Sequence, residues 1–318
     1  MRGSAGAVGG ITCLPGFLEA PIVGREHSCR RLPSRETGSA ETRRYPDRVV
    51  VRAVLRVVVV CLAVAGFSAS GWAADTPPGV LRIVFPEGWS ARQMADRVAE
   101  VRRIAIARRG VTPRLTGAEY TRAVRRVRPP RAFRAEAGDN VEGFLFPALY
   151  DFEGHTSAET LVANQLVAFE QRWRTVDLRP ARRRGRTPYE VLTIASMVER
   201  ETVAPEERRL VAAVIYNRLD RDMPLGIDAT LRYGLGIPGT KPLTKAHLAS
   251  SSPYNTRRFR GLPPTPIGNP GLASIRAAAN PAPVDYLYYV RKPDKMHHFF
   301  TADDEEFCRK AREYGYSC

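Results

Sequence analysis

Cysteine and lysine are both scarce in this chain of 318 residues. The five cysteines include no Cys-x-x-Cys pair, which excludes the common structural zinc sites and thioredoxin-like redox centres. Only five lysines stand beside 44 arginines, a bias typical of GC-rich coding sequences. The formal net charge is +16, but no Arg-Gly-aromatic or zinc-finger pattern accompanies it. Net charge alone therefore predicts no nucleic-acid partner.

Long hydrophobic runs are also rare, and one of them indicates export. Residues 57–74 contain no charged side chain and follow a segment with several arginines. Their number, 18, is at the lower limit for crossing a bilayer, and Gly71 and Ala73 are small enough for a signal peptidase. A membrane anchor and a cleaved signal both remain open. We expect a single-pass membrane protein with its main domain outside the cytoplasm, or a secreted one if the signal is cleaved.

The segment before this run has little periodicity and is rich in Gly, Ser, Arg and Pro. Residues 1–47 are expected to be an unstructured extension or the product of a start site assigned too early, and residues 48–74 to be the signal or transmembrane segment. Cys308 and Cys318 are the only cysteines after it. Because export reaches an oxidising compartment, these two cysteines are predicted to form a disulfide.

The exported part divides by pattern into two units. Alternating apolar residues predict a strand over 80–85, and Ser90 begins a helix in which Met94 and Val98 recur at helical spacing. A second helix is expected from Glu119 to Val127, followed by a proline-containing connector. The prediction is an α+β protein with a small strand-helix subdomain and connector over 79–134 and a larger α+β domain over 135–318.

Thr187 and Glu190 form a capping box around Pro188, so a helix is predicted over residues 188–201, with another from residue 205. Glu199 lies at the edge of the apolar arc of the first helix, and Glu201 lies about 200° further round. Only one of the two carboxyl groups can face a given cleft. A carboxyl group against apolar walls is suited to act as a general acid, although spacing alone favours an ordinary glutamate paired with a neighbouring arginine.

Six motifs occur in a fixed order and carry a family resemblance. They are EGFLFP (142–147), ASMVERE (195–201), YNRL (216–219), MPL (223–225), YNT (254–256) and GLPPTPIGNPG (261–271). This series resembles the endolytic murein transglycosylases, the MltG or YceG-like family, over residues 80–307. The resemblance implies a LysM-like subdomain before an α+β catalytic domain.

The resemblance also implies an activity. Family members cleave the β-1,4 bond between N-acetylmuramic acid and N-acetylglucosamine in nascent glycan strands and leave 1,6-anhydro ends, without a cofactor. By likeness Glu199 is the catalytic residue, with Glu201 as second choice. Peptidoglycan strands, the membrane and peptidoglycan synthases are the implied partners. The alternative is a catalytically silent peptidoglycan-binding or scaffold protein of the cell envelope.

Polar residues of the other motifs are candidates for holding the glycan, and each has an equally good structural explanation as a cap or turn residue. They are Glu142, Asn217, Asp228, Tyr254, Asn255, Thr256 and Asn269. The sequence departs from the family pattern at residues 226–230, which read GIDAT where Gln-Ser-Asp-Pro-Thr is frequent. Near the C-terminus, His297 and His298 lack a third ligand at suitable spacing, so no metal is expected.

Overall fold

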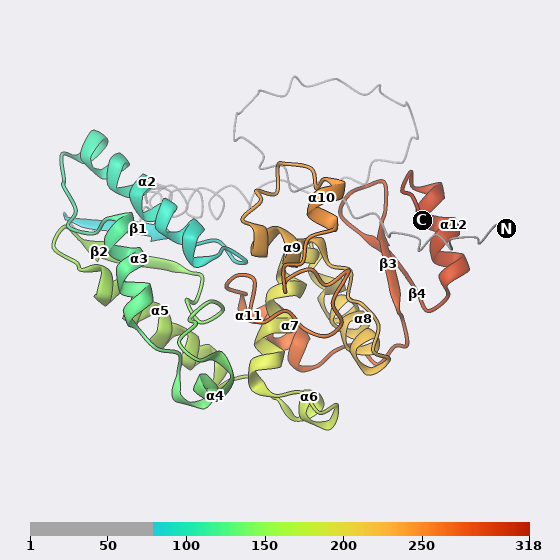
Figure 1. Cartoon of the computed structure of the whole chain (residues 1–318). Helices are drawn as coiled ribbons and strands as arrows, with labels where there is room; N and C mark the ends of the chain where they lie inside the picture. The colour runs from blue at the N-terminus through green and yellow to red at the C-terminus, as the bar shows by residue number, and fades with distance from the viewer. Residues whose placement is uncertain (1–78) are drawn as a thin grey trace, which may run out of the picture. The chain divides into compact units, whose positions relative to one another are not determined.

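Three apolar clusters organise residues 79–318, the part of the chain that the computed structural model describes. The elements that form them run in the order shown in Figure 1. They are β1 (Val80–Val84), α2 (Ala91–Arg109), α3 (Gly117–Arg126), η1 (Arg131–Phe133), α4 (Arg134–Ala137), β2 (Leu149–Glu153), α5 (Ala158–Trp173), α6 (Arg179–Arg183), α7 (Pro188–Glu201), η2 (Pro205–Glu207), α8 (Arg208–Asp220), α9 (Asp228–Leu235), α10 (Lys245–Leu248), α11 (Leu272–Ala279), β3 (Tyr288–Arg291), β4 (His298–Thr301) and α12 (Asp304–Glu313).

The first cluster lies between a two-stranded sheet and three helices. Strands β1 and β2 pair antiparallel, from Val80 opposite Glu153 to Val84 opposite Leu149. The predicted alternation is present in β1, since Leu81 is buried and its neighbours point outward. Helices α2, α3 and α5 pack together beside this sheet. The predicted strand and its following helix are therefore confirmed, and the whole is an α+β fold as expected.

The two large clusters do not divide at residue 135, where the sequence places the end of the small subdomain. Strand β1 takes its partner from residues 149–153, and the first cluster also includes Leu145, Phe152 and Leu161. A strand must satisfy its backbone groups on a neighbour, and that neighbour here lies beyond the proline-containing connector. The first core is thus built from both sides of the expected boundary.

The second cluster surrounds α7. Its N-terminus is as predicted: the Thr187 side chain accepts from the backbone N–H of Glu190, and the Glu190 side chain accepts from that of Thr187. Nearly every side chain in the middle of α7 is buried, and α8 and α11 pack against it. Ser196 takes part in this packing, since its hydroxyl accepts from the backbone N–H of Ile267 at 3.0 Å. Helix α7 therefore positions its last turn, which contains Glu199, against the loop before α11.

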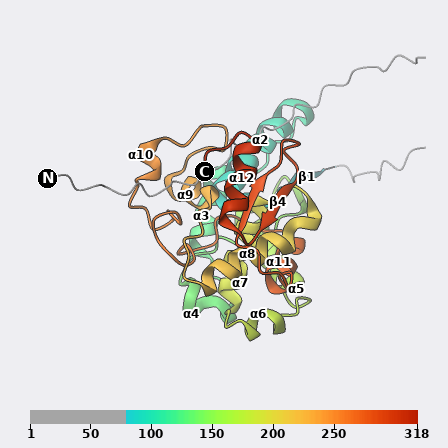
Figure 2. The same cartoon turned by 90° about the vertical axis from the view of Figure 1, so that its right-hand side faces the viewer.

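The third cluster is C-terminal and small. Strands β3 and β4 form an antiparallel pair, and α12 packs on them (Figure 2). A disulfide joins Cys308 in α12 to Cys318, with the two Cα atoms 5.3 Å apart. It ties the last residues of the chain back to α12.

No helix within residues 79–318 is both long and apolar enough to cross a membrane. The apolar run at 57–74 and the N-terminal extension at 1–47 lie outside the described residues. The expectations about export, anchoring and start site therefore remain predictions from sequence.

We expect the Cys308–Cys318 disulfide to stabilise the C-terminal cluster. Closing so short a loop restricts the unfolded chain, so the double change Cys308→Ser, Cys318→Ser should lower the free energy of unfolding by about 2 to 3 kcal/mol. Denaturant titration of both proteins measures this difference. Intact mass with and without reductant tests the bond itself, and two alkylatable thiols in protein recovered from outside the cytoplasm would contradict it.

Candidate active site

Glu199 lies in the last turn of α7 with its side chain only 8% exposed. Its Oε2 atom accepts a hydrogen bond of 2.9 Å from the backbone N–H of Gly271, the residue that caps the N-terminus of α11. Its Oε1 atom lies 3.9 Å from Nη2 of Arg208 in α8. A negative charge is favoured by both an arginine and a helix N-terminus. The carboxylate of α7 is thus held by two groups, one at the start of α8 and one at the start of α11.

The loop that follows β1 borders this carboxylate. The backbone N–H of Gly88 donates to the Asn269 carbonyl at 2.8 Å, and the backbone N–H of Asn269 donates to the Trp89 carbonyl at 2.9 Å. Arg200, next to Glu199, donates to the Gly88 carbonyl at 3.2 Å. A side chain at Gly88 would place its Cβ 3.2 Å from Cγ of Glu199. Residues 86–89 and 267–271 therefore form one wall around Glu199.

The side chains of Asn269 and Glu142 link the segments of this wall by hydrogen bonds. The Asn269 side chain accepts from the backbone N–H groups of Gly143 and Leu145, both at 2.9 Å, and donates to a Glu142 carboxylate oxygen at 2.6 Å. Glu142 also accepts from the backbone N–H of Ala91 and the hydroxyl of Tyr233, both at 3.0 Å. Burial raises the pKa of Glu142, and these hydrogen bonds lower it. Burial is the larger effect, so the pKa is about 7. Both side chains bind protein groups, which favours their structural explanation.

Glu201 occupies a different environment from Glu199. Its carboxylate accepts from the hydroxyl of Tyr289 in β3 at 3.1 Å. Burial raises the pKa of Glu201, and the nearby Asp228 raises it further. The two glutamates of α7 thus lie against different elements, as the helical angle between them requires.

Asn217 and Asp228 stabilise local structure. The Asn217 amide donates to the carbonyls of Val284 and Tyr286 at 2.9 Å and 2.8 Å, which fixes the segment before β3. Asp228 begins α9 and pairs with Arg257 at 2.7 Å. Both side chains therefore have protein partners that explain them.

Tyr254, Asn255 and Thr256 form the segment that supports residues 226–230. The Tyr254 hydroxyl bonds to that of Thr265 at 2.8 Å, and the Thr256 hydroxyl accepts from the backbone N–H of Ile227 at 3.0 Å. Asn255 is fully buried and its amide donates to two carbonyls, while its Oδ1 atom has no hydrogen-bond partner among the described residues. These residues shape the loops rather than contact the Glu199 carboxylate.

Sequence reasoning missed Glu87. Its carboxylate lies against Gly271, where a Cβ would come within 1.8 Å of Glu87 Oε1. The only sequence signal was a Pro-Glu-Gly turn after β1, which reads as an ordinary surface turn.

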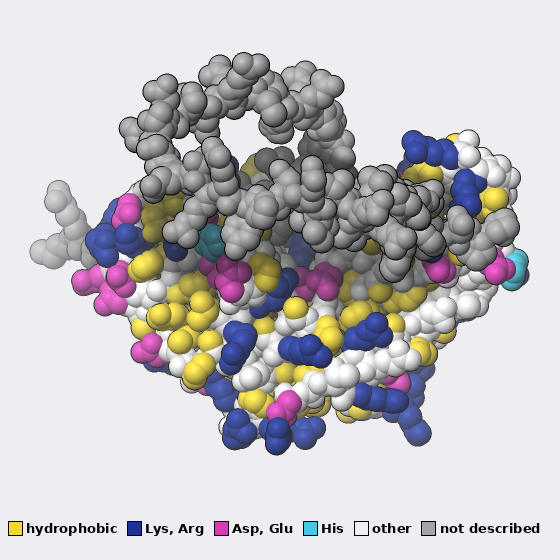
Figure 3. Space-filling view, turned by 180° about the vertical axis from the view of Figure 1, so that it is seen from behind, with side chains coloured by type: hydrophobic (Ala, Val, Ile, Leu, Met, Phe, Trp, Pro, Cys, Tyr) yellow, Lys and Arg dark blue, Asp and Glu magenta, His cyan; other side chains and the backbone are white. Residues whose placement is uncertain are grey.

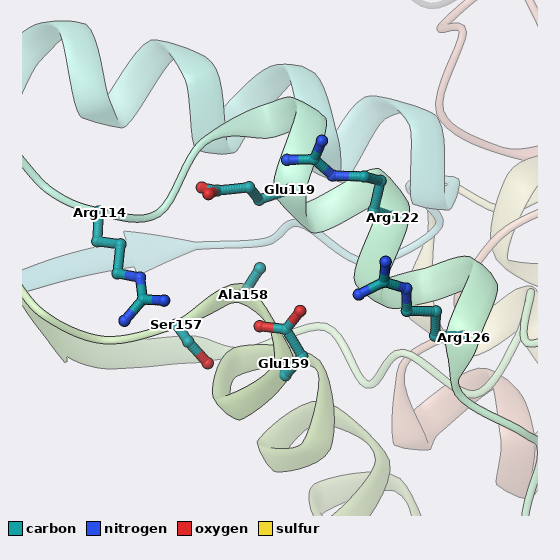
Figure 4. A pocket seen from close by; sticks show the side chains of 7 residues that line it. All are labelled: Arg114, Glu119, Arg122, Arg126, Ser157, Ala158 and Glu159. Carbon is teal, nitrogen blue, oxygen red and sulfur yellow. The ribbon is translucent and has the colours of Figure 1, made fainter.

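A separate pocket of about 240 Å³ lies on the first cluster (Figure 4). Arg122 and Arg126 line this pocket from α3, and Glu159 lines it from the first turn of α5. The pocket contains no residue of the Glu199 wall.

On the face shown in Figure 3, basic side chains are interspersed with acidic and apolar ones rather than gathered in one patch. Among residues 79–318 no three His, Cys, Asp or Glu side chains are placed to hold a metal.

The model of the YceG-like family matches residues 70–313, which is most of the chain. The chain belongs to this family. The similarity includes the loop after β1, α7 with Glu199, and the loop before α11.

Curated and solved relatives agree with this assignment. The chain is similar to proteins named endolytic murein transglycosylase from Streptococcus pneumoniae strain R6 (33% identical over 178 residues, 55% of this chain and 32% of the relative) and Bacillus subtilis strain 168 (37% identical over 153 residues, 48% and 42%). It therefore spans less than half the length of these relatives. A crystal structure of a yceG-like protein from Listeria monocytogenes matches 71% of this chain and 74% of that one, with a TM-score of 0.58 and 29% identity.

We expect Glu142 to make the stability of this YceG-like protein depend on pH. Its folded pKa of about 7 lies above the ordinary value of 4.5, so the folded state binds the proton more tightly. The free energy of unfolding should fall by about 3 kcal/mol through this group as pH rises from 4.5 to 7. Glu142→Gln should remove that slope. Denaturant titrations at several pH values measure it, with the exposed Glu305→Gln as control, and equal slopes in all three proteins would contradict the prediction.

Proposed function

We propose that this protein is an endolytic peptidoglycan lytic transglycosylase that uses Glu199 as its acid and base. The observation that carries the proposal is the Glu199 carboxylate, largely enclosed in the last turn of α7 and held between the N-terminus of α11 and Arg208. Membership of the YceG-like family and the names of the curated relatives support the reaction class. The substrate is the β-1,4 bond between N-acetylmuramic acid and N-acetylglucosamine inside a glycan strand.

One carboxyl group is sufficient for this chemistry, in contrast to hydrolases that require two. Protonated Glu199 gives its proton to the leaving glycosidic oxygen, and the C1–O4 bond breaks. The C6 hydroxyl of the same muramyl ring then bonds to C1 and gives up its proton, which returns to Glu199. The product is a 1,6-anhydro end, and no water is consumed. Because the nucleophile belongs to the substrate, the protein gains rate mainly by holding the ring in a reactive shape.

The arrangement around Glu199 suits this task. Oε2 is engaged by the Gly271 N–H, so the carboxyl group has a fixed orientation and Oε1 remains for proton transfer. The polar residues proposed to hold the glycan act mainly through the loops that they stabilise, because their side chains are already bonded to protein groups.

The cellular setting belongs to the same proposal. The apolar run at 57–74 would anchor the protein or direct its export, and the first cluster would act as a LysM-like glycan-positioning unit. Peptidoglycan synthases are the proposed protein partners. A catalytically silent binder of peptidoglycan is the competing function, and it would keep the fold without requiring the Glu199 carboxyl group.

Glu199→Gln should lower the rate of glycan cleavage by about 100-fold to 10,000-fold, because the amide has the same shape but cannot exchange a proton. Purified protein is incubated with sacculi and with uncrosslinked glycan, and the products are weighed. An anhydro end is lighter than a hydrolysed end by one water. Thermal unfolding of the variant should match that of the wild type.

Glu201→Gln is the matched control on the same helix, and we expect it to retain much more activity. A larger loss in Glu201→Gln than in Glu199→Gln would transfer the acid role to Glu201. Wild-type protein that binds glycan but cleaves none of it would establish the silent binder instead, and cleavage that yields only hydrolysed ends would contradict the transglycosylase reaction.

A further inference from the structure

Glu87 places a second carboxyl group at the Glu199 site. The Glu87 carboxylate lies so close to Gly271 that a Cβ there would be 1.8 Å from Oε1 and 2.6 Å from Oε2. The backbone N–H of the same glycine donates to Glu199. Two carboxyl groups that are more than a hundred residues apart in the sequence therefore lie against one residue, and a Cβ at position 271 would displace the Glu87 carboxylate.

The position of Glu87 is fixed by its neighbours rather than by its own side chain. Gly88 has a φ of +77°, which few residues other than glycine adopt, and its N–H and carbonyl are both bonded, to Asn269 and Arg200. A Cβ on Gly268 would lie 2.4 Å from the Gly88 carbonyl oxygen, so the two loops touch at their backbones. The loop cannot shift without breaking these contacts. The backbone at residues 87 and 88 is therefore held beside the last turn of α7.

The Glu87 carboxylate stabilises no other group among the described residues. It makes no hydrogen bond or ion pair within residues 79–318, and the residue is exposed. The charged groups that face it are Glu199 from α7 and Arg208 from α8, with Arg200 bonded to the adjacent carbonyl. Partial burial raises the pKa of Glu87, Glu199 raises it further and Arg208 lowers it. A carboxylate that has no partner among the described residues and lies beside a second carboxylate is a candidate for chemistry.

We propose that Glu87 is a second catalytic carboxylate, which takes the proton of the muramyl C6 hydroxyl while Glu199 donates to the glycosidic oxygen. This inference rests on the proposed function and changes it in one respect: the base role passes from Glu199 to Glu87, while Glu199 keeps the acid role. As the C1–O4 bond breaks, the proton of Glu199 goes to O4; as the O6–C1 bond forms, the proton of O6 goes to Glu87. One proton then passes from Glu87 back to Glu199, directly or through water, and both groups are restored. Glu199 Oε2 is occupied by Gly271, so a separate acceptor spares Oε1 from serving both oxygens.

The first test measures cleavage by Glu87→Gln and Glu87→Ala. Each should lower kcat by about 100-fold or more with little change in KM and in thermal unfolding, since the side chain has no structural partner. Added formate should restore part of the activity of Glu87→Ala, because a small carboxylate can replace the missing base. Glu305→Gln, an exposed glutamate on α12, serves as the control. Near-normal activity of Glu87→Gln beside an active wild type would overturn the base role but leave the proposed function standing.

The second test needs no substrate and examines the pairing alone. Carboxyl ¹³C resonances of labelled glutamate, assigned with Glu87→Gln, give the titration midpoint of Glu87. In Glu199→Gln this midpoint should fall, because the neighbouring negative charge is gone. An unchanged midpoint would show that the two groups do not face each other and would overturn the inference.

The third test uses the contact with Gly271. Gly271→Ala keeps the backbone N–H for Glu199 but forces the Glu87 carboxylate aside, so it should reduce kcat as Glu87→Gln does. Combined with Glu87→Gln it should add little further loss, since both changes remove the same interaction. Full activity of Gly271→Ala, or additive losses in the double variant, would overturn the inference. An inactive wild type would overturn the proposed function, and the base role with it.

Discussion

The buried contact between Asn269 and Glu142 is the interaction on which the rest of the site depends. Through these two side chains, the loop after β1, the residues 142–145 and the loop before α11 are held together. Each of these segments leaves backbone N–H groups that no helix or strand satisfies. A buried unsatisfied group costs about 1 to 3 kcal/mol, so one asparagine that serves several of them stabilises the whole junction.

The same contact explains why a carboxyl group is tolerated in the core. Glu142 is almost fully buried, and burial alone would make its charged form very unfavourable. Hydrogen bonds from Ala91, Tyr233 and Asn269 offset much of that cost. The consequence is a junction that is both strong and sensitive to protonation. Because this junction places Gly88 and Gly271 beside Glu199, its integrity also determines the geometry of the proposed chemistry.

Helix α7 fixes the positions of the two glutamates in its last turn. Its buried face and its packing against α8 and α11 leave little freedom in its last turn. Glu199 and Glu201 are only two residues apart, yet one meets the N-terminus of α11 and Arg208 while the other meets Tyr289. Separation of two acids by helical geometry gives each a different partner, and it is the partner that decides what the carboxyl group can do.

The sequence by itself determined the local elements and the family. The capping box at Thr187, the alternation in β1 and the motif order were all readable because each depends on neighbouring residues. Only the tertiary structure decided the rest. Sequence spacing does not reveal that β1 pairs with residues 149–153, nor that the side chains of Asn269 and Glu142 bond to each other. The position of Glu87 could not be predicted for the same reason. It is separated from Glu199 by more than a hundred residues, and both carboxyl groups lie against Gly271 because of loop packing, which no local pattern encodes.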